Sequence, residues 1–162
     1  MMPRDEAPIS YMERTRDYYR ALGYAKDYVW AHFPEVPFAR LPKSLREARI
    51  GVITTAHAPG KANTDAKGIR RVWSGAVDPL PVPNTDNLAW DRESTHTEDL
   101  ESYLPIATLN GLAQEGLFGA LAERFHGVPT EYSQRKTIEE DAPEILARLR
   151  EDRVDAVLLS AL

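Results

Sequence analysis

The sequence predicts an α/β domain in which helices cover a mostly parallel sheet in three layers. Two apolar runs carry this prediction: residues 49–56 read RIGVITTA and residues 154–160 read VDAVLLS. Runs of aliphatic and β-branched side chains of this length are typical of buried parallel strands. The second run directly follows a helical pattern, and a helix that leads into such a strand is half of a βαβ unit.

The composition is that of an ordinary globular protein, and it excludes several classes of function. Its 162 residues suffice for one domain with a substantial core, and its 43% hydrophobic and 28% charged residues are average values. A net charge of −5 gives no electrostatic support for binding a nucleic acid or an anionic membrane. The sequence contains no cysteine, which excludes disulfides, thiolate nucleophiles and Cys-ligated zinc.

Neither a secretion signal nor a membrane span is visible in the sequence. Residues 1–10 are charged and contain prolines, unlike the apolar core of a signal peptide. No apolar run approaches the roughly 18 residues that a spanning helix needs. We therefore expect a cytoplasmic protein whose partners are neither membranes nor nucleic acids.

Residues 1–48 are expected to form an N-terminal helical and proline-rich arm, packed on a core of residues 49–162 within a single domain, 1–162. Ser10, with Glu13 three residues later, predicts a capping box at the start of a helix that Gly23 ends. The arm also carries an aromatic cluster: Tyr24, Tyr28, Trp30 and Phe33. We interpret these rings as packing onto the domain or a second copy, and the alternative is the wall of a ligand pocket.

A long irregular connection, residues 59–92, follows the first strand. Prolines and glycines interrupt it, and only residues 69–73 read as a strand, which we place at a sheet edge. A connection of this length in a compact domain is usually functional or mobile. Arg70 and Arg71 could hold a carboxylate or a phosphate, although a solvated strand face is the simpler interpretation.

A helix and a strand are expected after this connection. Pro105 stands in the first turn of the helix and Gly116 at its end, and Ile106, Leu109 and Leu112 form its apolar face. A turn then leads into a strand at residues 121–126, which Gly127 and Pro129 close.

The last helix is the clearest pattern in the chain. Thr137 is its expected cap, acidic residues fill the first turn, and Ile145 and Leu149 belong to the buried stripe. Pro143 falls inside this pattern, so the regular helix is expected to start with Ala142 as its cap. With the strand that follows, this order is typical of Rossmann-like and flavodoxin-like folds.

Polar side chains gather where the first strand ends, and this is where we expect a site. Ligands of open α/β sheets bind outside the carboxyl ends of the parallel strands. His57 lies just beyond that end and His96 lies in a later polar segment, so both are candidate catalytic residues. We interpret His32 and His126 as structural. The side chains expected to contact a small-molecule ligand are Thr54, Thr55, Arg70, Arg71 and Ser160.

The segment around His96 also raises the question of a metal. Residues 94–99 read STHTED, and the side chains available to ligate an ion are His57, His96 and Asp99. The tight spacing within this segment favours a simpler interpretation, in which Thr95 or Thr97 caps a helix whose first turn is acidic. The sequence identifies no cofactor.

Three stretches form an ordered pattern along the chain. Residues 38–56 read FARLPKSLREARIGVITTA, residues 104–119 read LPIATLNGLAQEGLFG, and residues 142–159 read APEILARLREDRVDAVLL. This pattern resembles the selenoprotein B family of the glycine, sarcosine, betaine and D-proline reductases. The family's corresponding patterns are L-x-K-P-L-x-x-A-R-V-x-L-V-T-T-A, P-I-x-R-L-x-E-L-x-x-E-G-x-I-G and A-P-E-x-A-x-x-L-x-x-D-G-V-D-A-V-L-L. The resemblance covers residues 38–162.

The resemblance implies a reductase relative, with one departure. In that family a loop carrying selenocysteine or cysteine attacks an activated substrate during reductive C–N cleavage, and a separate pyruvoyl-bearing subunit activates some substrates. In the shorter members this loop follows the strand that corresponds to residues 154–160. Here no cysteine occurs and no selenocysteine is written, so we expect a redox-inactive member.

Three functions are consistent with these observations. The first is a redox-inactive relative of reductase component B that acts as a subunit or a small-molecule binder. The second is an enzyme of lyase, isomerase or reductase type that acts on a small amine or carboxylate through His57 and His96. The third is a structural subunit that completes a partner's active site.

We expect a homo-oligomer, because the aromatic arm and the edge of the sheet both need burial. A second expected partner is a reductase subunit that bears the missing cysteine or selenocysteine. Both expectations concern assembly, and neither identifies a substrate.

Overall fold

The computed structural model describes residues 10–27, 29, 32–36, 39–60, 71–85, 93–130 and 133–162. The chain divides into two compact units, Met1–Pro37 and Phe38–Leu162, and each is described by itself. Residues 38–48, which we assigned to the arm from the sequence, group with the unit that carries the sheet.

The first unit contains α1 (Tyr11–Ala21), a helix with no buried residue. Ser10 stands at its N-cap as expected, but the Ser10 side chain makes no capping hydrogen bond, so the expected capping box is wrong. Gly23 follows the helix with a φ of 87°, a conformation that favours glycine. An ion pair between Arg20 and Asp27 ties the end of the helix to the next segment.

The aromatic side chains of this unit contact one another along the helix end. The Tyr19 ring lies edge-on to the rings of Tyr18 and Tyr24, at centroid distances of 5.5 and 5.4 Å. Phe33 is exposed. Two further members of the aromatic cluster lie outside the described residues: Tyr28 and Trp30.

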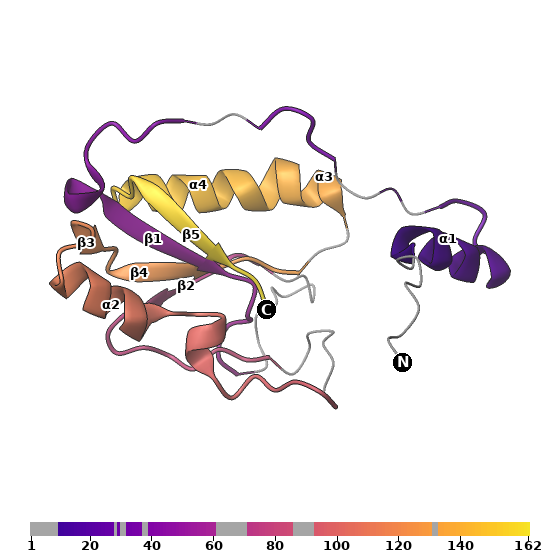
Figure 1. Cartoon of the computed structure of the whole chain (residues 1–162), viewed down its shortest axis with the longest axis horizontal. Coiled ribbons are helices and arrows are strands. Elements are labelled where there is room, and N and C mark those ends of the chain that lie inside the picture. Colours follow the sequence, from indigo (N-terminus) through magenta and orange to yellow (C-terminus); the bar gives the residue numbers. More distant parts are fainter. Residues whose placement is uncertain are drawn as a thin grey trace, which may run out of the picture. The chain divides into compact units, whose positions relative to one another are not determined.

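The second unit is built on an open, mostly parallel sheet of five strands, as predicted. The strands are β1 (Arg49–Thr54), β2 (Trp73–Ala76), β3 (Ala120–Leu121), β4 (Arg124–Gly127) and β5 (Ala156–Ser160). β1 runs parallel to β3, β4 and β5, and β2 runs antiparallel to β4 (Figure 1). The chain therefore has the α/β content that its apolar runs predict.

The register places β1 in the middle of this sheet. β3 pairs with the start of β1, β4 pairs with its end, and β5 pairs with it from Ile50 to Thr54. Because a strand has two edges, β3 and β4 share one edge of β1 and β5 occupies the other. β2, β3 and β5 thus each pair with only one strand among the described residues. The edge position expected for β2 is confirmed, although the strand lies later in the chain than predicted.

Successive residues of β1 pack into two separate hydrophobic cores. Val52 packs in one with Phe125 and with Ile106, the first residue of α2 (Ile106–Gln114). Ile53 packs in the other, whose members include Ile145 and Leu149 of α4 (Ala142–Glu151). Successive side chains of a strand point to opposite faces. The two helices therefore bury opposite faces of the sheet (Figure 1).

Short helical turns precede β1 and α2 in the chain. A 3₁₀ turn, η1 (Leu45–Glu47), is closed by the capping box of Ser44 and Glu47. A second turn, η2 (Leu100–Ser102), precedes α2 and is capped by Asp99, whose side chain accepts from Glu101 N–H. The threonine cap expected in this segment is therefore wrong. An aspartate side chain fills the same role.

The last helix begins earlier than the sequence suggested. Helical structure starts with α3 (Gln134–Lys136), where the Ser133 side chain accepts from Lys136 N–H, so the expected caps at Thr137 and Ala142 are wrong. A π-helical turn, η3 (Thr137–Asp141), connects α3 to α4. Pro143 stands in the first turn of α4, where its missing N–H is tolerated. None of the helices in the described part of the chain is long and apolar enough to cross a membrane.

The final strand differs from its prediction in burial. β5 was expected to be a buried strand, yet Val157, Leu158 and Leu159 are 43%, 40% and 61% exposed. The reason is its position, since β1 is its only partner among the described strands. The apolar composition predicts the strand correctly but does not distinguish a central strand from an outer one.

Candidate functional site

The hydroxyl groups at the carboxyl end of β1 are bound to the backbone. The Thr54 hydroxyl is buried and accepts from Ala56 N–H at 3.3 Å. The Thr55 hydroxyl accepts from Leu162 N–H at 2.9 Å and donates to the Leu162 carbonyl at 3.3 Å. We expected the side chains of Thr54 and Thr55 to contact a ligand, and in the structure they stabilise the local backbone conformation.

His57 lies beyond the same strand end and is buried against a second segment. Its backbone N–H and C=O each hydrogen bond to Asn84, at 2.9 Å, and the residue is 4% exposed. The Trp73 indole N–H donates to the Ala56 carbonyl at 3.0 Å, next to His57. These contacts fix the position of His57 between the end of β1 and the loop that carries Asn84.

His96, the other candidate catalytic residue, is exposed. Its neighbour Thr97 shares a hydroxyl hydrogen bond of 2.8 Å with Thr85, which is adjacent to Asn84. The segments of His57 and His96 are thus linked through two loop contacts. Within the described ranges no three His, Asp or Glu side chains form a group that could hold a metal ion, so His57, His96 and Asp99 do not converge.

The remaining candidates lie in different settings. Arg71 is exposed, lies before β2 begins, and is 3.7 Å from a Glu140 carboxylate oxygen. Ser160 is half-buried at the end of β5 and pairs in register with Thr54. Arg70 lies outside the described residues.

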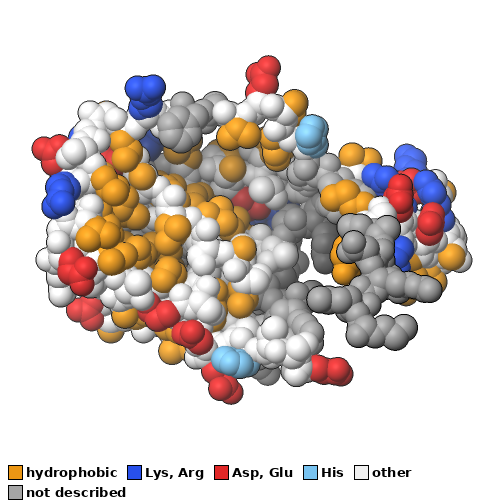
Figure 2. Space-filling view, viewed as in Figure 1, with side chains coloured by type: hydrophobic (Ala, Val, Ile, Leu, Met, Phe, Trp, Pro, Cys, Tyr) orange, Lys and Arg blue, Asp and Glu red, His pale blue; other side chains and the backbone are white. Residues whose placement is uncertain are grey.

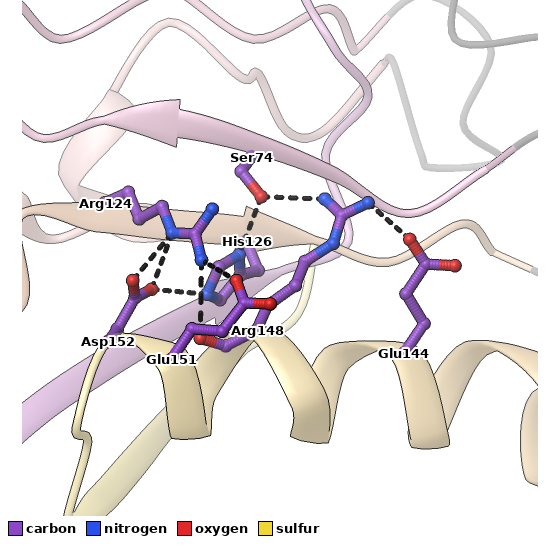
Figure 3. Close-up of polar contacts among 7 residues, drawn as sticks. All are labelled: Ser74, Arg124, His126, Glu144, Arg148, Glu151 and Asp152. Carbon is purple, nitrogen blue, oxygen red and sulfur yellow. Dashed lines mark hydrogen bonds and ion pairs between the residues drawn. The ribbon is translucent and has the colours of Figure 1, made fainter.

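A polar cluster centres on His126, which is fully buried on β4 (Figure 3). Its Nδ1 lies 2.8 Å from the Ser74 hydroxyl on β2, and its Nε2 lies 3.1 Å from an Asp152 carboxylate oxygen at the end of α4. Arg124 binds both Asp152 oxygens through Nε, at 2.7 and 2.8 Å, and reaches Glu151 through Nη2 at 2.7 Å. The cluster therefore joins α4 to two strands.

The hydrogen bonds define the protonation of His126. An ionised Asp152 can only accept, so Nε2 carries the proton and Nδ1 accepts from the Ser74 hydroxyl. Burial lowers the pKa of His126, the Asp152 carboxylate opposes this effect, and the guanidinium groups of Arg124 and Arg148 add to it. The imidazole is therefore neutral at physiological pH.

This cluster has the hydroxyl–imidazole–carboxylate order of a hydrolytic triad, but its contacts are those of a structural clamp. The Ser74 oxygen also accepts from Arg148 Nη1 at 2.8 Å. Arg148 in turn binds Glu144 and the Val72 carbonyl, so it fixes Ser74 rather than leaving it to a substrate. A triad serine needs a free approach for the reacting carbon. We interpret the cluster as the joint between α4, β2 and β4.

The interpretation of His126 as structural agrees with this geometry, whereas its partners were missed. One sequence signal was available: Glu144, Arg148 and Asp152 recur every four residues and so share a face of the last helix. The strand residues Arg124 and His126 are two apart and share a face of β4. Neither spacing says that the two faces meet.

An apolar surface extends along β5. A groove of about 300 Å³ lies beside the strand, lined mostly by side chains of the α4 core and by Leu159. Leu146 of α4 is 46% exposed next to it. Figure 2 shows hydrophobic side chains gathered on the part of the molecule where Figure 1 places β5.

Comparisons with known proteins identify no relative. No family model matches the chain, and neither the curated proteins nor the solved structures contain a match. The function must therefore be argued from the site itself.

Proposed function

We propose that this chain is a redox-inactive assembly subunit, related to reductase component B, whose outer strand β5 pairs with a second copy. The observation that carries the proposal is that β5 pairs on one edge only among the described strands and carries uncharged side chains. Residues 156–160 read AVLLS, and three of these five side chains are large, apolar and at least 40% exposed. Outer strands of monomers are usually protected by charges, prolines or bulges.

The sequence of β5 suits pairing with itself. In an antiparallel pair centred on Leu158, Leu158 faces its copy and Val157 faces Leu159, so no like charges oppose one another. Such a contact is isologous, which is the usual interface of a two-fold dimer. It would extend the sheet across two copies and cover the groove beside Leu159 and Leu146.

The remaining expectations fit within this proposal. The absence of cysteine supports a subunit without redox chemistry. The sheet would be the centre of a three-layer, Rossmann-like or flavodoxin-like domain, with residues 1–48 as an arm on it. The same chain would bind a small molecule and work in the cytoplasm. A cysteine- or selenocysteine-bearing reductase subunit would be its partner in the complete enzyme.

Sedimentation equilibrium of the purified chain at micromolar concentration tests the proposal. The wild type is expected to sediment as a dimer, and Leu158→Lys as a monomer, because two ammonium groups would face each other at the two-fold axis. Val82→Lys is the matched control, since Val82 is 73% exposed and lies outside the strands of the sheet. A monomeric wild type, or equal dissociation of the two variants, would contradict the proposal.

A further inference from the structure

The chain leaves α4 through a residue whose backbone conformation normally selects glycine. Arg153 has a φ of 55°. Its N–H donates to the Arg150 carbonyl, and Val154 N–H donates to the Leu149 carbonyl, which together form a Schellman motif. The corresponding residues after α1 and α2 are Gly23 and Gly116, both with positive φ.

An arginine in this position is strained, and strain of this kind persists where the side chain has a use. Arg153 lines two neighbouring hollows at the amino end of the sheet, and Arg49, at the start of β1, lines both of them as well. The larger hollow has a volume of about 460 Å³ and also takes in Lys43 and Arg46. The strained residue therefore lies at a concave, basic surface.

The charges of this larger hollow are not balanced. Its two carboxylates already have partners: Asp155 accepts from Lys43 Nζ and Arg49 N–H, and Glu47 accepts from the Ser44 hydroxyl. The hydrogen bonds from Arg49 N–H and Lys43 lower the pKa of Asp155, so it is ionised at neutral pH.

The arginines of the hollow keep hydrogen-bond donors that no described group accepts. Arg46 donates from Nη1 to the Gly116 carbonyl at 3.0 Å, and its guanidinium group makes no other hydrogen bond among the described residues. Among the described residues, the guanidinium group of Arg153 makes no ion pair and no hydrogen bond. The guanidinium group of Arg49 makes no hydrogen bond, and its positive charge acts on the Asp155 carboxylate. Three cationic forks therefore surround a hollow in a chain whose net charge is −5.

The smaller hollow, on the other side of Arg49 and Arg153, carries acidic side chains. Glu123, Glu151 and Asp152 line it. Arg124 already binds two of these, Glu151 and Asp152. A negatively charged ligand is therefore expected in the larger hollow and not in the smaller one.

We propose that Arg46, Arg49 and Arg153 form a binding site for the phosphate group of a small phosphorylated molecule. Guanidinium forks match the oxygens of a phosphate in pairs, and several of them favour a dianion over a singly charged carboxylate. The volume of the larger hollow, about 460 Å³, exceeds that of a phosphate alone and suits a small phosphomonoester. This site is separate from β5, so it stands or falls independently of dimer formation.

Isothermal titration with inorganic phosphate, in a buffer of low ionic strength without other oxyanions, tests the site. Saturable binding is expected, and Arg153→Gly is expected to weaken it at least about tenfold, the effect of one charge-assisted hydrogen bond. Because glycine suits the backbone at this position, the variant is also expected to melt no lower than the wild type. Loss of binding would then not reflect unfolding.

Two controls define the outcomes that would overturn the proposal. Arg150→Gln removes one positive charge from the end of the same helix, outside both hollows, and is expected to leave phosphate affinity within about twofold. Acetate, a singly charged carboxylate, is expected to bind more weakly than phosphate. Absence of saturable binding, wild-type affinity in Arg153→Gly, an equal loss in Arg150→Gln, or tighter binding of acetate would each overturn the assignment. The same titration of Leu158→Lys separates this site from the proposed dimer.

Discussion

The two ends of the sheet use their polar side chains in opposite ways. At the carboxyl end of β1, the hydroxyls of Thr54 and Thr55 are hydrogen bonded to nearby backbone. At the amino end, Arg49 and Arg153 line a hollow, and no described group accepts a hydrogen bond from either guanidinium group. The first end has side chains that hold the fold. The second has side chains that are available to a ligand.

This difference teaches that the usual position of ligand sites in α/β sheets is not enough to locate a site in a particular chain. Ligands of open α/β sheets usually bind at the carboxyl ends of the strands. In this chain the residues at that end are enclosed by the loop contact of His57 with Asn84 and by the indole of Trp73. The comparison can be tested by changing residues at each end and measuring stability and binding separately.

The largest effect is expected from Gly127, which pairs with Thr54 at the carboxyl end. A Cβ at this position would lie 1.8 Å from Trp73 Nε1, so Gly127→Ala must displace a buried indole. We expect a loss of about 3 kcal/mol in the free energy of unfolding, measured with urea.

The matched control for Gly127 is Gly111→Ala. Nothing lies within 4 Å of a Cβ at Gly111, which is inside α2. This substitution is expected to stabilise the chain by about 0.5–1 kcal/mol through helix propensity. If both substitutions had the same small effect, the carboxyl end would not be closely packed.

The next largest effect concerns the His126 cluster and pH. Burial holds the pKa of His126 below its ordinary value of 6.5 in the folded chain, so the unfolded chain takes up this proton first as the pH falls. The free energy of unfolding is therefore expected to decrease below pH 6.5, by up to about 1.4 kcal/mol per pH unit, and to be unaffected by His126 above it.

Urea denaturation between pH 7.5 and 5.5 measures this slope, with His126→Gln as the comparison. The variant lacks the titrating group, so its stability is expected to vary less over the same range. Equal slopes for the wild type and the variant would mean that His126 does not hold its neutral form in the fold.

The smallest effects compare the two ends directly. Thr55→Val removes the hydrogen bonds to Leu162 and is expected to lower the free energy of unfolding by about 1 kcal/mol. Arg153→Gly relieves a strained backbone and is expected to raise it by about 1 kcal/mol. Thermal unfolding of both variants checks the opposite signs. A loss of stability in Arg153→Gly would mean that the arginine serves the fold and not a ligand.

The sequence predicts the strands well because their signals are local. The run at β1 predicts its position, its burial and its place in a parallel sheet, and all three are confirmed. The run at β5 predicts a strand but not its exposure, since exposure depends on which strands pair with it. The strand at β2 lies four residues later than residues 69–73 suggested, because Trp73 begins it rather than ending it.

The candidate site was less predictable because it depends on contacts between distant segments. His126 and Asp152 meet only when β4 and α4 pack together, and no spacing in the sequence specifies that contact. Arg153 has a local signal, since helices usually end in glycine at this position, and the sequence reads Asp152-Arg153-Val154 instead. That signal becomes visible only once the end of the helix is known.

The most direct test of the account is a map of amide chemical shifts during a titration with phosphate. The amides of Arg49 and Arg153, with those of Gly119 and Ala120 in the same hollow, are expected to shift together and to saturate. The amides of Thr54, Thr55 and His57 are expected to stay unchanged. Shifts confined to the carboxyl end of β1 would contradict the account and return the site to the place that the sequence first indicated.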